Sequence, residues 1–333
     1  MHSEARARGP DLGALFRAQR GSLWGLAYRL TGTAADADDV VQEAFARALT
    51  AGLRSPSARC AQLAAAPEPR AGSLAPWLVR VVTHLAIDVL RRRKRRRYEG
   101  PWLPAPCEDE GAGSDRDTPR AGDHADPERR YGLAESATFA FLIALEALAP
   151  RPRAALLLRD VLGYSARETA DALATTEANV RVLHLRGRRA LADYDRERCV
   201  PDAALRDRHR AALERLHACL LAQDADALEA LFTESVHTVT DANGEYTALT
   251  QPMSGRARVA RFYRLAALHR QASDARSEIR SANGLPALFT VLGRPQRRQA
   301  PRSLLRVELD GEDRIRAVQV VLAPRKLAAV RFA

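Results

Sequence analysis

The sequence has few groups that could hold a metal or cross-link the chain. Its four cysteines are far apart and form no CxxC pair, so we expect neither a zinc site nor a disulfide framework. Long apolar runs are also missing: the longest, FAFLIALEALA, is too short to cross a bilayer and contains Glu146. The first residues, MHSEARARGPDLG, lack the apolar core of a signal peptide. These absences predict a cytoplasmic protein without a metal, a cofactor or a membrane segment.

Lysine is almost absent, although the chain is strongly basic. Only Lys94 and Lys326 are lysines among 52 cationic residues, against 41 Asp and Glu, and the formal net charge is +11. This excess predicts attraction to nucleic acid or to an anionic membrane surface, without specifying a fold. With 333 residues, 46% of them hydrophobic, the chain is long enough for two or three domains with cores of their own.

The first part of the chain, residues 11–106, predicts a helical domain. Apolar residues recur at helical spacing over residues 11–31, and Gly32 is typical of a helix end. Thr33 is a candidate N-cap for a second helix that runs to about Thr50. Acidic side chains near the start of that helix favour the positive end of its dipole.

A third helix is predicted from Leu74 to Arg97, after a loop at residues 51–73 that is rich in Ala, Pro and Ser. It ends in seven consecutive cations, Arg91 to Arg97. Positive charge is favoured at a helix C-terminus, but neighbouring cations repel one another unless an anion lies nearby. The run is therefore either a solvated surface or, in our interpretation, a surface that holds a polyanion.

Residues 107–134 are predicted to form a flexible acidic linker. Between residues 107 and 130 the sequence has eight acidic and four basic side chains and almost nothing apolar. Such a segment cannot bury enough surface to offset the conformational entropy lost on ordering. A domain boundary is expected there.

The following segment, residues 135–196, predicts a second helical domain. Ser165 and Glu168 form a capping-box pattern at the start of a short helix. Thr175 or Thr176 then caps another helix, which is edged with polar and arginine side chains. Two helices joined by a tight turn in this way are typical of a helix-turn-helix that binds DNA.

From residue 203 to residue 330 the pattern is that of an α+β domain. A long helix and a short one precede strand-like runs, with one more helix between them. Three dipeptides are hairpin signals: Asn243-Gly244, Asn283-Gly284 and Asp310-Gly311. The chain is therefore predicted to be multidomain, with two all-α domains followed by an α+β domain that has a curved antiparallel sheet.

Several stretches occur in an order that one known family shares. LFRAQRGSLWGLAYRLTGTAADADDVVQEAFARAL opens the first domain, WLVRVVTHLAIDVLRRRKRRR forms its third helix, and the helix-turn-helix follows. These stretches resemble regions 2 and 4 of the extracytoplasmic-function sigma factors of bacterial RNA polymerase. YEGPWLPAP, DANG, NGLPALF and APRKL further resemble the subgroup with a SnoaL-like C-terminal extension.

The resemblance implies that the partners are core RNA polymerase, through its β′ clamp helices and β flap, and promoter DNA, without a membrane. The polymerase-binding residues would lie on the acidic second helix: Asp38, Asp39, Gln42 and Glu43. The other reading of these residues is a solvated helix start whose charges only favour the dipole.

The resemblance also implies two DNA contacts. The −10 region would be bound by the third helix and its basic tail, through Arg80, His84, Arg91, Arg92, Arg93, Lys94 and Arg95. The −35 region would be bound by the helix-turn-helix, with base edges or phosphates contacted by Thr176, Glu177, Asn179, Arg181, Arg186, Arg188 and Arg189. The family places a base pocket in the loop at residues 51–73, which is longer here, so its residues stay unassigned.

The last domain resembles a cone-shaped fold in which a curved sheet surrounds a cavity. His237 and Asp241 would share one strand face, and the other titratable candidates are Glu234, His217 and Asp224. No catalytic residue is assigned, because no paired-carboxylate or His–Asp motif stands out. In the sigma subgroup the extension acts as a built-in regulator.

Two other functions stay open. One is a ligand-responsive regulator that binds duplex DNA without polymerase, and it has no need of an acidic docking helix beside a basic one. The other is an enzyme whose C-terminal domain is catalytic, and a His237–Asp241 pair inside a closed pocket would favour it. Whether a separate anti-sigma partner exists is not indicated by the sequence.

Overall fold

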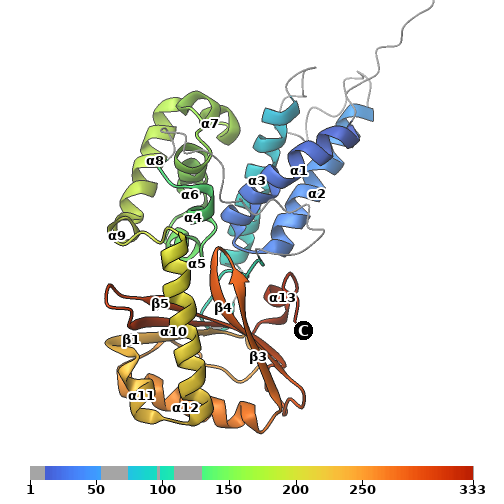
Figure 1. Cartoon of the computed structure of the whole chain (residues 1–333). Coiled ribbons are helices and arrows are strands. Elements are labelled where there is room, and N and C mark those ends of the chain that lie inside the picture. The colour runs from blue at the N-terminus through green and yellow to red at the C-terminus, as the bar shows by residue number, and fades with distance from the viewer. Residues whose placement is uncertain (1–11, 54–73, 96–97, 109–129, 333) are drawn as a thin grey trace, which may run out of the picture.

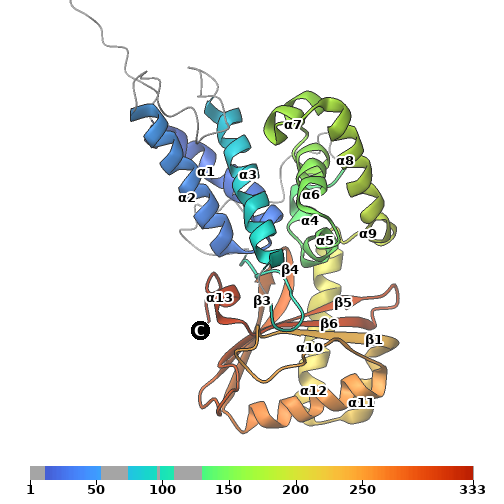
Figure 2. The same ribbon diagram turned by 180° about the vertical axis from the view of Figure 1, so that it is seen from behind.

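The computed structural model describes residues 12–53, 74–95, 98–108 and 130–332. Two helical domains lie on one side of the sheet of the C-terminal domain (Figure 1). The segment 98–108 runs between them, as the view from behind shows (Figure 2). This segment, which follows α3, is called the connector below.

Three helices form the N-terminal domain, close to their predicted bounds: α1 (Leu12–Thr31), α2 (Ala34–Leu53) and α3 (Leu74–Arg95). Thr33 caps α2 as predicted, because its hydroxyl accepts a hydrogen bond from Asp36 N at 3.2 Å. The apolar faces of the three helices meet around Leu26, Val41 and Leu78, all of them buried. Most of the predicted loop at residues 51–73 lies outside the described residues.

Gly32 connects α1 to α2 in a conformation that favours glycine. Its φ is +74°, and a Cβ at this position would lie 2.6 Å from Cη2 of Trp102. The Gly32 carbonyl accepts a hydrogen bond from Ala105 N at 2.8 Å. Trp102 and Ala105 belong to the connector, so this helix end also seats the segment that leads to the next domain.

The second helical domain contains α4 (Leu133–Ser136), α5 (Phe139–Leu145), α6 (Pro150–Leu156), a π-helical turn (Leu157–Val161), α7 (Ala166–Leu173), α8 (Glu177–Ala190) and α9 (Ala192–Arg196). The predicted capping box of α7 is present, with reciprocal hydrogen bonds between Ser165 and Glu168 of 2.8 and 3.2 Å. Thr176, one of the two predicted candidates, caps α8 by accepting from Asn179 N at 3.2 Å. The turn before α8 has Ala174 at φ +48°.

The two helical domains pack directly against each other. One apolar cluster includes Leu30 and Val82 of the first domain and Leu156 and Leu173 of the second. Arg29 of α1 is buried between them, and donates to the Ser136 hydroxyl at 2.7 Å and to the Leu133 carbonyl at 2.9 Å. Burial lowers the pKa of Arg29 to about 10. The two domains therefore form one apolar unit in this arrangement.

Both described ends of the predicted linker at residues 107–134 are packed into the protein. Cys107 and Tyr131 are buried, and Tyr131 donates to Asp195 Oδ1 of α9 at 2.6 Å. The strongly acidic stretch 109–129 lies outside the described residues. The two described ends of the predicted linker are thus held in the folded protein by buried residues, Cys107 and Tyr131.

The C-terminal domain contains α10 (Ala203–Ala222), α11 (Ala225–Ala230), β1 (Phe232–Asp241), β2 (Met253–Ser254), α12 (Arg256–Gln271), β3 (Ala275–Ala282), β4 (Leu285–Leu292), β5 (Arg302–Leu309), β6 (Ile315–Val321) and α13 (Pro324–Leu327). Its sheet has the order β2-β1-β6-β5-β4-β3. The prediction of a purely antiparallel sheet is wrong, since β1 and β6 are parallel. Parallel neighbours need a long crossover, and here α12 and the four strands β2, β3, β4 and β5 lie between them in the chain.

One of the three hairpin signals marks a tight hairpin. Asn283 and Gly284 have φ of +56° and +80° and join β3 to β4. Asn243-Gly244 turns the chain but leads into a loop before the short β2. At Asp310-Gly311 the connection is longer than two residues, since β5 ends at Leu309 and β6 begins at Ile315. The Asp310 carboxylate accepts from the backbone N–H groups of Glu312 and Arg314 in this loop, both at 2.9 Å.

Both faces of this sheet are buried. Leu288 and Val320 belong to a cluster with α10 and α12, on the outer side of the molecule. Phe289 and Val321, their neighbours in sequence, belong to a cluster with Phe139 of α5, on the side of the helical domains. Because side chains alternate along a strand, β4 and β6 contribute to two different interfaces.

Candidate functional site

The acidic helix α2 has an exposed face. Asp39, Gln42 and Glu43 are exposed, and Glu43 forms an ion pair with Arg47 one turn later at 2.8 Å. Leu49 continues this face and is 50% exposed, although it was not predicted as a site residue. A face that combines carboxylates with an exposed leucine is suited to a protein partner with a basic and partly apolar surface.

Asp38 differs from its neighbours because it is tied into the domain. Its carboxylate accepts from Trp24 Nε1 at 3.0 Å and lies 3.8 Å from Arg20. Trp24 is buried in the core of α1 and stacks on Tyr28. The structure therefore brings Asp39, Gln42 and Glu43 to one open face, whereas Asp38 stabilises the packing beneath it.

The predicted −10 residues on the body of α3 are covered. Arg80 and His84 are half-buried, at the place where α7 packs on α3. The Leu173 carbonyl at the end of α7 contacts His84 and also accepts from Arg151 Nη2 at 3.0 Å. Burial lowers the pKa of His84, and the hydrogen bond to Leu173 only partly opposes this. We call this packing of α7 on α3 the closed arrangement.

The cationic run at the end of α3 is divided between solvent and protein. Arg91, Arg92, Lys94 and Arg95 are exposed, and Arg91 pairs with Asp88 at 3.2 Å. Residues 96 and 97 lie outside the described residues. The exposed part of the run is suited to phosphate, because no part of the chain that the structure describes covers these four side chains.

Arg93 is the exception, since it points into the protein. It donates to the Thr31 carbonyl at 2.8 Å and to Glu146 at 2.5 Å, and its guanidinium lies 4.0 Å from the Trp102 ring. Glu146 also pairs with Arg153, which is buried, at 2.8 Å. Arg93 was predicted as a DNA contact, and in the closed arrangement it links the two helical domains instead.

Helix α8, the second helix of the predicted helix-turn-helix, presents an open face. The exposed residues that were predicted for the −35 region are Thr176, Glu177, Asn179, Arg181, Arg186 and Arg189. Val182 and Leu185 lie among them, 46% and 50% exposed, and were not predicted. Exposed apolar groups on such a helix can contact the methyl group of thymine. Their positions between the arginines of a polar helix face were the signal in the sequence.

Arg188 and His184 lie on the inner side of α8. His184 Nε2 is 2.7 Å from Asp160 in the π-helical turn, and Arg188 is 3.9 Å from the same carboxylate. Gly187 allows the close approach of α8 to α6, because a Cβ there would lie 3.1 Å from Leu156. Arg188, which was predicted as a phosphate contact, thus faces the Asp160 carboxylate and is half-buried.

The connector is held by a buried polar junction with the C-terminal domain. Asp241 at the end of β1 is fully buried, and accepts from Tyr98 OH at 2.5 Å, from Leu103 N at 2.7 Å and from Lys326 Nζ at 2.5 Å. Lys326 also donates to the Leu103 carbonyl. Burial lowers the pKa of Lys326 to about 8, against the opposing effect of Asp241.

Two further contacts extend this junction to the helical domains. Trp102 lies between Arg93 of α3 and Lys326, and the Lys326 Nζ is 4.2 Å from the centre of the Trp102 ring. Asn283 in the β3–β4 turn donates to the Tyr28 hydroxyl at 2.7 Å and to the Ala137 carbonyl at 2.8 Å. The motifs YEGPWLPAP, DANG, NGLPALF and APRKL, which are far apart in sequence, therefore meet at one place.

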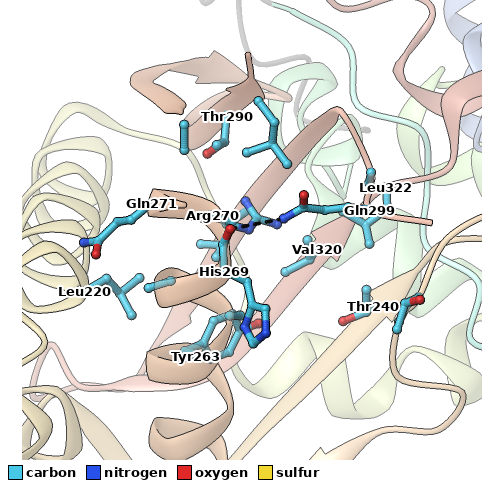
Figure 3. A pocket seen from close by; sticks show the side chains of 18 of the residues that line it. Leu220, Thr240, Tyr263, His269, Arg270, Gln271, Thr290, Gln299, Val320 and Leu322 are labelled. Carbon is cyan, nitrogen blue, oxygen red and sulfur yellow. Dashed lines mark hydrogen bonds between the residues drawn. The ribbon is translucent and has the colours of Figure 1, made fainter. Parts of the chain in front are cut away.

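The structure does not bring His237 and Asp241 together in a pocket. His237 is exposed, and Asp241 is enclosed by the connector and α13. The domain does contain a cavity, between the sheet, α10 and α12 (Figure 3). Thr240 and His217 line it, but neither His237 nor Asp241 does. The observation that would have favoured an enzyme is therefore absent from the described residues.

The part of the chain that the structure describes offers neither a metal site nor a membrane-spanning helix. No group of three or more His, Cys, Asp or Glu side chains there could hold a metal ion. Among the same residues, no helix combines the length and the apolar character that a bilayer crossing requires.

Comparisons with known proteins agree with this geometry. The Sigma-70 region 2 model matches residues 15–54, and the Sigma-70, region 4 model matches residues 139–191. The ECF RNA polymerase sigma factor SigJ of Mycobacterium tuberculosis is 36% identical over 250 residues, which span 74% of this chain and 70% of that protein. SigG of the same species is 34% identical over 257 residues, 69% of this chain and 61% of that protein.

The likeness extends to the C-terminal domain. The crystal structure of the M. tuberculosis extracytoplasmic function sigma factor SigJ has a TM-score of 0.65 and 28% identity, and the match covers 95% of this chain and 98% of that one. The two sigma models, the related sequences and this shared architecture lead to one conclusion. The chain belongs to the extracytoplasmic-function (ECF) RNA polymerase sigma factors.

Proposed function

We propose that this chain directs core RNA polymerase to specific promoters, that it reads their −10 and −35 elements, and that its C-terminal domain regulates this step. The observation that carries the proposal is a difference in accessibility. The acidic face of α2 and the recognition face of α8 are exposed, whereas the −10 part of α3 is covered by α7. An initiation factor regulated in this way keeps its docking surfaces available and its strand-opening surface closed.

The docking face on α2 would bind the β′ clamp helices of the polymerase. Asp39 is exposed at the centre of this face, and no ion pair with it is found among the described residues. Complementary charge at such a surface increases the association rate and excludes wrong partners. Glu43, already paired with Arg47, would contribute less. The helix-turn-helix domain would contact the β flap.

The DNA surfaces would act in sequence. The −35 element would enter against α8, where Arg181, Arg186 and Arg189 are exposed. Contact with the −10 element requires α7 to leave α3, so that Arg80 and His84 become available. The cationic tail, Arg91 to Arg95, would then bind phosphates as the strands separate, since phosphate contacts give affinity and register.

The C-terminal domain would control this opening through the connector. Asp241 and Lys326 hold the connector at Leu103, and Trp102 carries the contact on to Arg93 and Gly32. In this arrangement the junction is intact and Arg93 is paired with Glu146. Release of the connector would free the ends of both helical domains at once, which makes the junction a regulatory point.

A binding assay with core polymerase tests the docking surface. We expect Asp39→Lys to weaken binding of the full chain to core polymerase at least about tenfold, because close like charges cost more than about 1.4 kcal/mol at a desolvated interface. Glu214→Lys, an equal charge reversal at an exposed position of α10, is the matched control. Asp38 is avoided because its carboxylate holds Trp24.

Run-off transcription completes the test. The wild-type chain with core polymerase should start transcription at a discrete site, and Asp39→Lys should lose this activity while keeping its circular dichroism spectrum. A chain that binds promoter DNA equally well without polymerase, and whose Asp39→Lys variant behaves like Glu214→Lys, would support a polymerase-independent regulator instead.

A further inference from the structure

The cavity of the C-terminal domain is large and mainly apolar. Its volume is about 610 Å³, within the range of small-molecule sites. A cavity of this size has room for a drug-sized small molecule. Its apolar walls come from helices and strands alike, and include Leu220, Phe262, Leu288, Leu305 and Val320. A space of this size with such walls favours a ligand with an apolar body.

Arg270 brings a positive charge into this space. It belongs to the last turn of α12 and lies among the labelled lining residues, next to Gln299 (Figure 3). Its Nη1 donates to the Ser303 hydroxyl at 2.7 Å, and among the described residues no carboxylate forms an ion pair with it. Arg270 is half-buried, and its position at a helix C-terminus compensates its charge only in part. The guanidinium therefore lacks an anion.

The rest of the lining has the same sign of charge. Arg297 and Arg298 also line the cavity and are exposed, in the loop between β4 and β5. Among the described residues, the lining contains neither Asp nor Glu. Thr240 adds a buried hydroxyl that has no hydrogen-bond partner among the described residues. Buried polar groups are normally paired, so the cavity offers unused donors beside its apolar walls.

We propose that this cavity binds an amphipathic carboxylate: an apolar body held by the walls, and a carboxylate held by Arg270. A carboxylate matches the planar fork of a guanidinium better than a neutral head group does, and low-dielectric surroundings strengthen the pairing. A cationic ligand is disfavoured by the three arginines. A purely apolar ligand would fill the space but leave Arg270 without a counter-ion.

Matched pairs of probes test the head group on the wild-type full chain. Decanoate is compared with 1-decanol, and 2-naphthoate with 2-naphthol, by isothermal titration calorimetry near neutral pH. We expect at least one carboxylate to bind about tenfold or more tightly than its alcohol, the effect of one charge-assisted pair. The proposal is overturned if neither carboxylate binds more tightly than its uncharged partner.

Variants then locate the site. Arg270→Gln should remove the preference for the carboxylate, and Arg270→Lys should keep part of it. Arg261→Gln, an exposed arginine on the same helix, is the matched control and should keep it in full. Ala267→Trp, which fills the cavity from its lining, should abolish binding of both probes. A preference that survives Arg270→Gln, or binding that survives Ala267→Trp, would place the carboxylate elsewhere and refute the proposal.

Discussion

Removal of the Asp241 carboxylate should release the connector. In the wild type this one fully buried group satisfies the Tyr98 hydroxyl, the Leu103 N–H and the Lys326 ammonium. Asp241→Ala leaves a buried cation with a single carbonyl acceptor, and two further donors without one. The perturbation therefore acts on the contact between the C-terminal domain and the rest of the chain.

The free-energy cost of Asp241→Ala follows from the burial of the Asp241–Lys326 ion pair. Breaking a buried ion pair by removing one partner costs about 3–5 kcal/mol. Lys326 can reduce this by losing its proton, because burial already lowers its pKa to about 8. We therefore take the lower end, about 3 kcal/mol, which corresponds to a shift of roughly a hundredfold from connector-bound to connector-free molecules.

Cys107 provides the assay. Its thiol is buried at the end of the connector, 3% exposed, and its backbone N–H donates to Asn283 at 2.9 Å. We expect the rate of Cys107 alkylation, followed by peptide mass spectrometry, to rise roughly a hundredfold in Asp241→Ala. Asp313→Ala removes a partly exposed ion pair with Arg208 and should change this rate little.

A second substitution separates the charge from the fold. Asp241→Asn combined with Lys326→Met removes both charges and keeps an acceptor, so it should recover much of the lost protection, as for other buried pairs replaced together. If Cys107 in folded Asp241→Ala reacts at the wild-type rate, the junction does not hold the connector and the reasoning fails.

Two further predictions follow from the surfaces and from the core. Arg92→Gln should lower the slope of promoter affinity against salt by about one unit, while exposed Arg210→Gln on α10 leaves it unchanged; equal slopes in wild type and Arg92→Gln would mean that the tail holds no phosphate. His209 is buried in α10, and burial lowers its pKa to about 4. Because the unfolded chain takes up this proton first, the stability contributed by His209 is complete above about pH 6.5 and is lost as the pH falls through 4, in total about 3 kcal/mol. Between pH 7 and pH 4, the free energy of unfolding measured with denaturant should fall less in His209→Gln than in the wild type. An identical fall in both would mean that His209 does not cause this pH dependence.

Local signals were read correctly from the sequence. The caps at Thr33, Ser165 and Thr176 and the helix bounds depend on neighbouring residues, which the sequence shows directly. The tight turn at Asn283-Gly284 is of the same kind, because its dipeptide prefers the left-handed region. These features need no knowledge of what packs where.

The sequence could not show the surroundings of several predicted site residues, because these depend on packing between distant parts of the chain. His84 and Arg93 have the polarity of DNA contacts, but Leu173 of α7 and Glu146 reach these two side chains only in the folded chain. Asp241 was considered as an acid–base group because its spacing from His237 gives a shared strand face. Spacing along a strand does not show what lies against that face, which here is the connector.

Because both faces of the sheet are buried, neighbouring residues of one strand contact different parts of the protein. Along β4, Leu288 borders the cavity and Phe289 packs towards α5; along β1, Thr240 borders the cavity and Asp241 grips the connector. Because consecutive residues share one backbone, a displacement of the strand at one of these residues also moves its neighbour on the opposite face. A ligand in the cavity and the connector of the helical domains would therefore contact consecutive residues of the same strand.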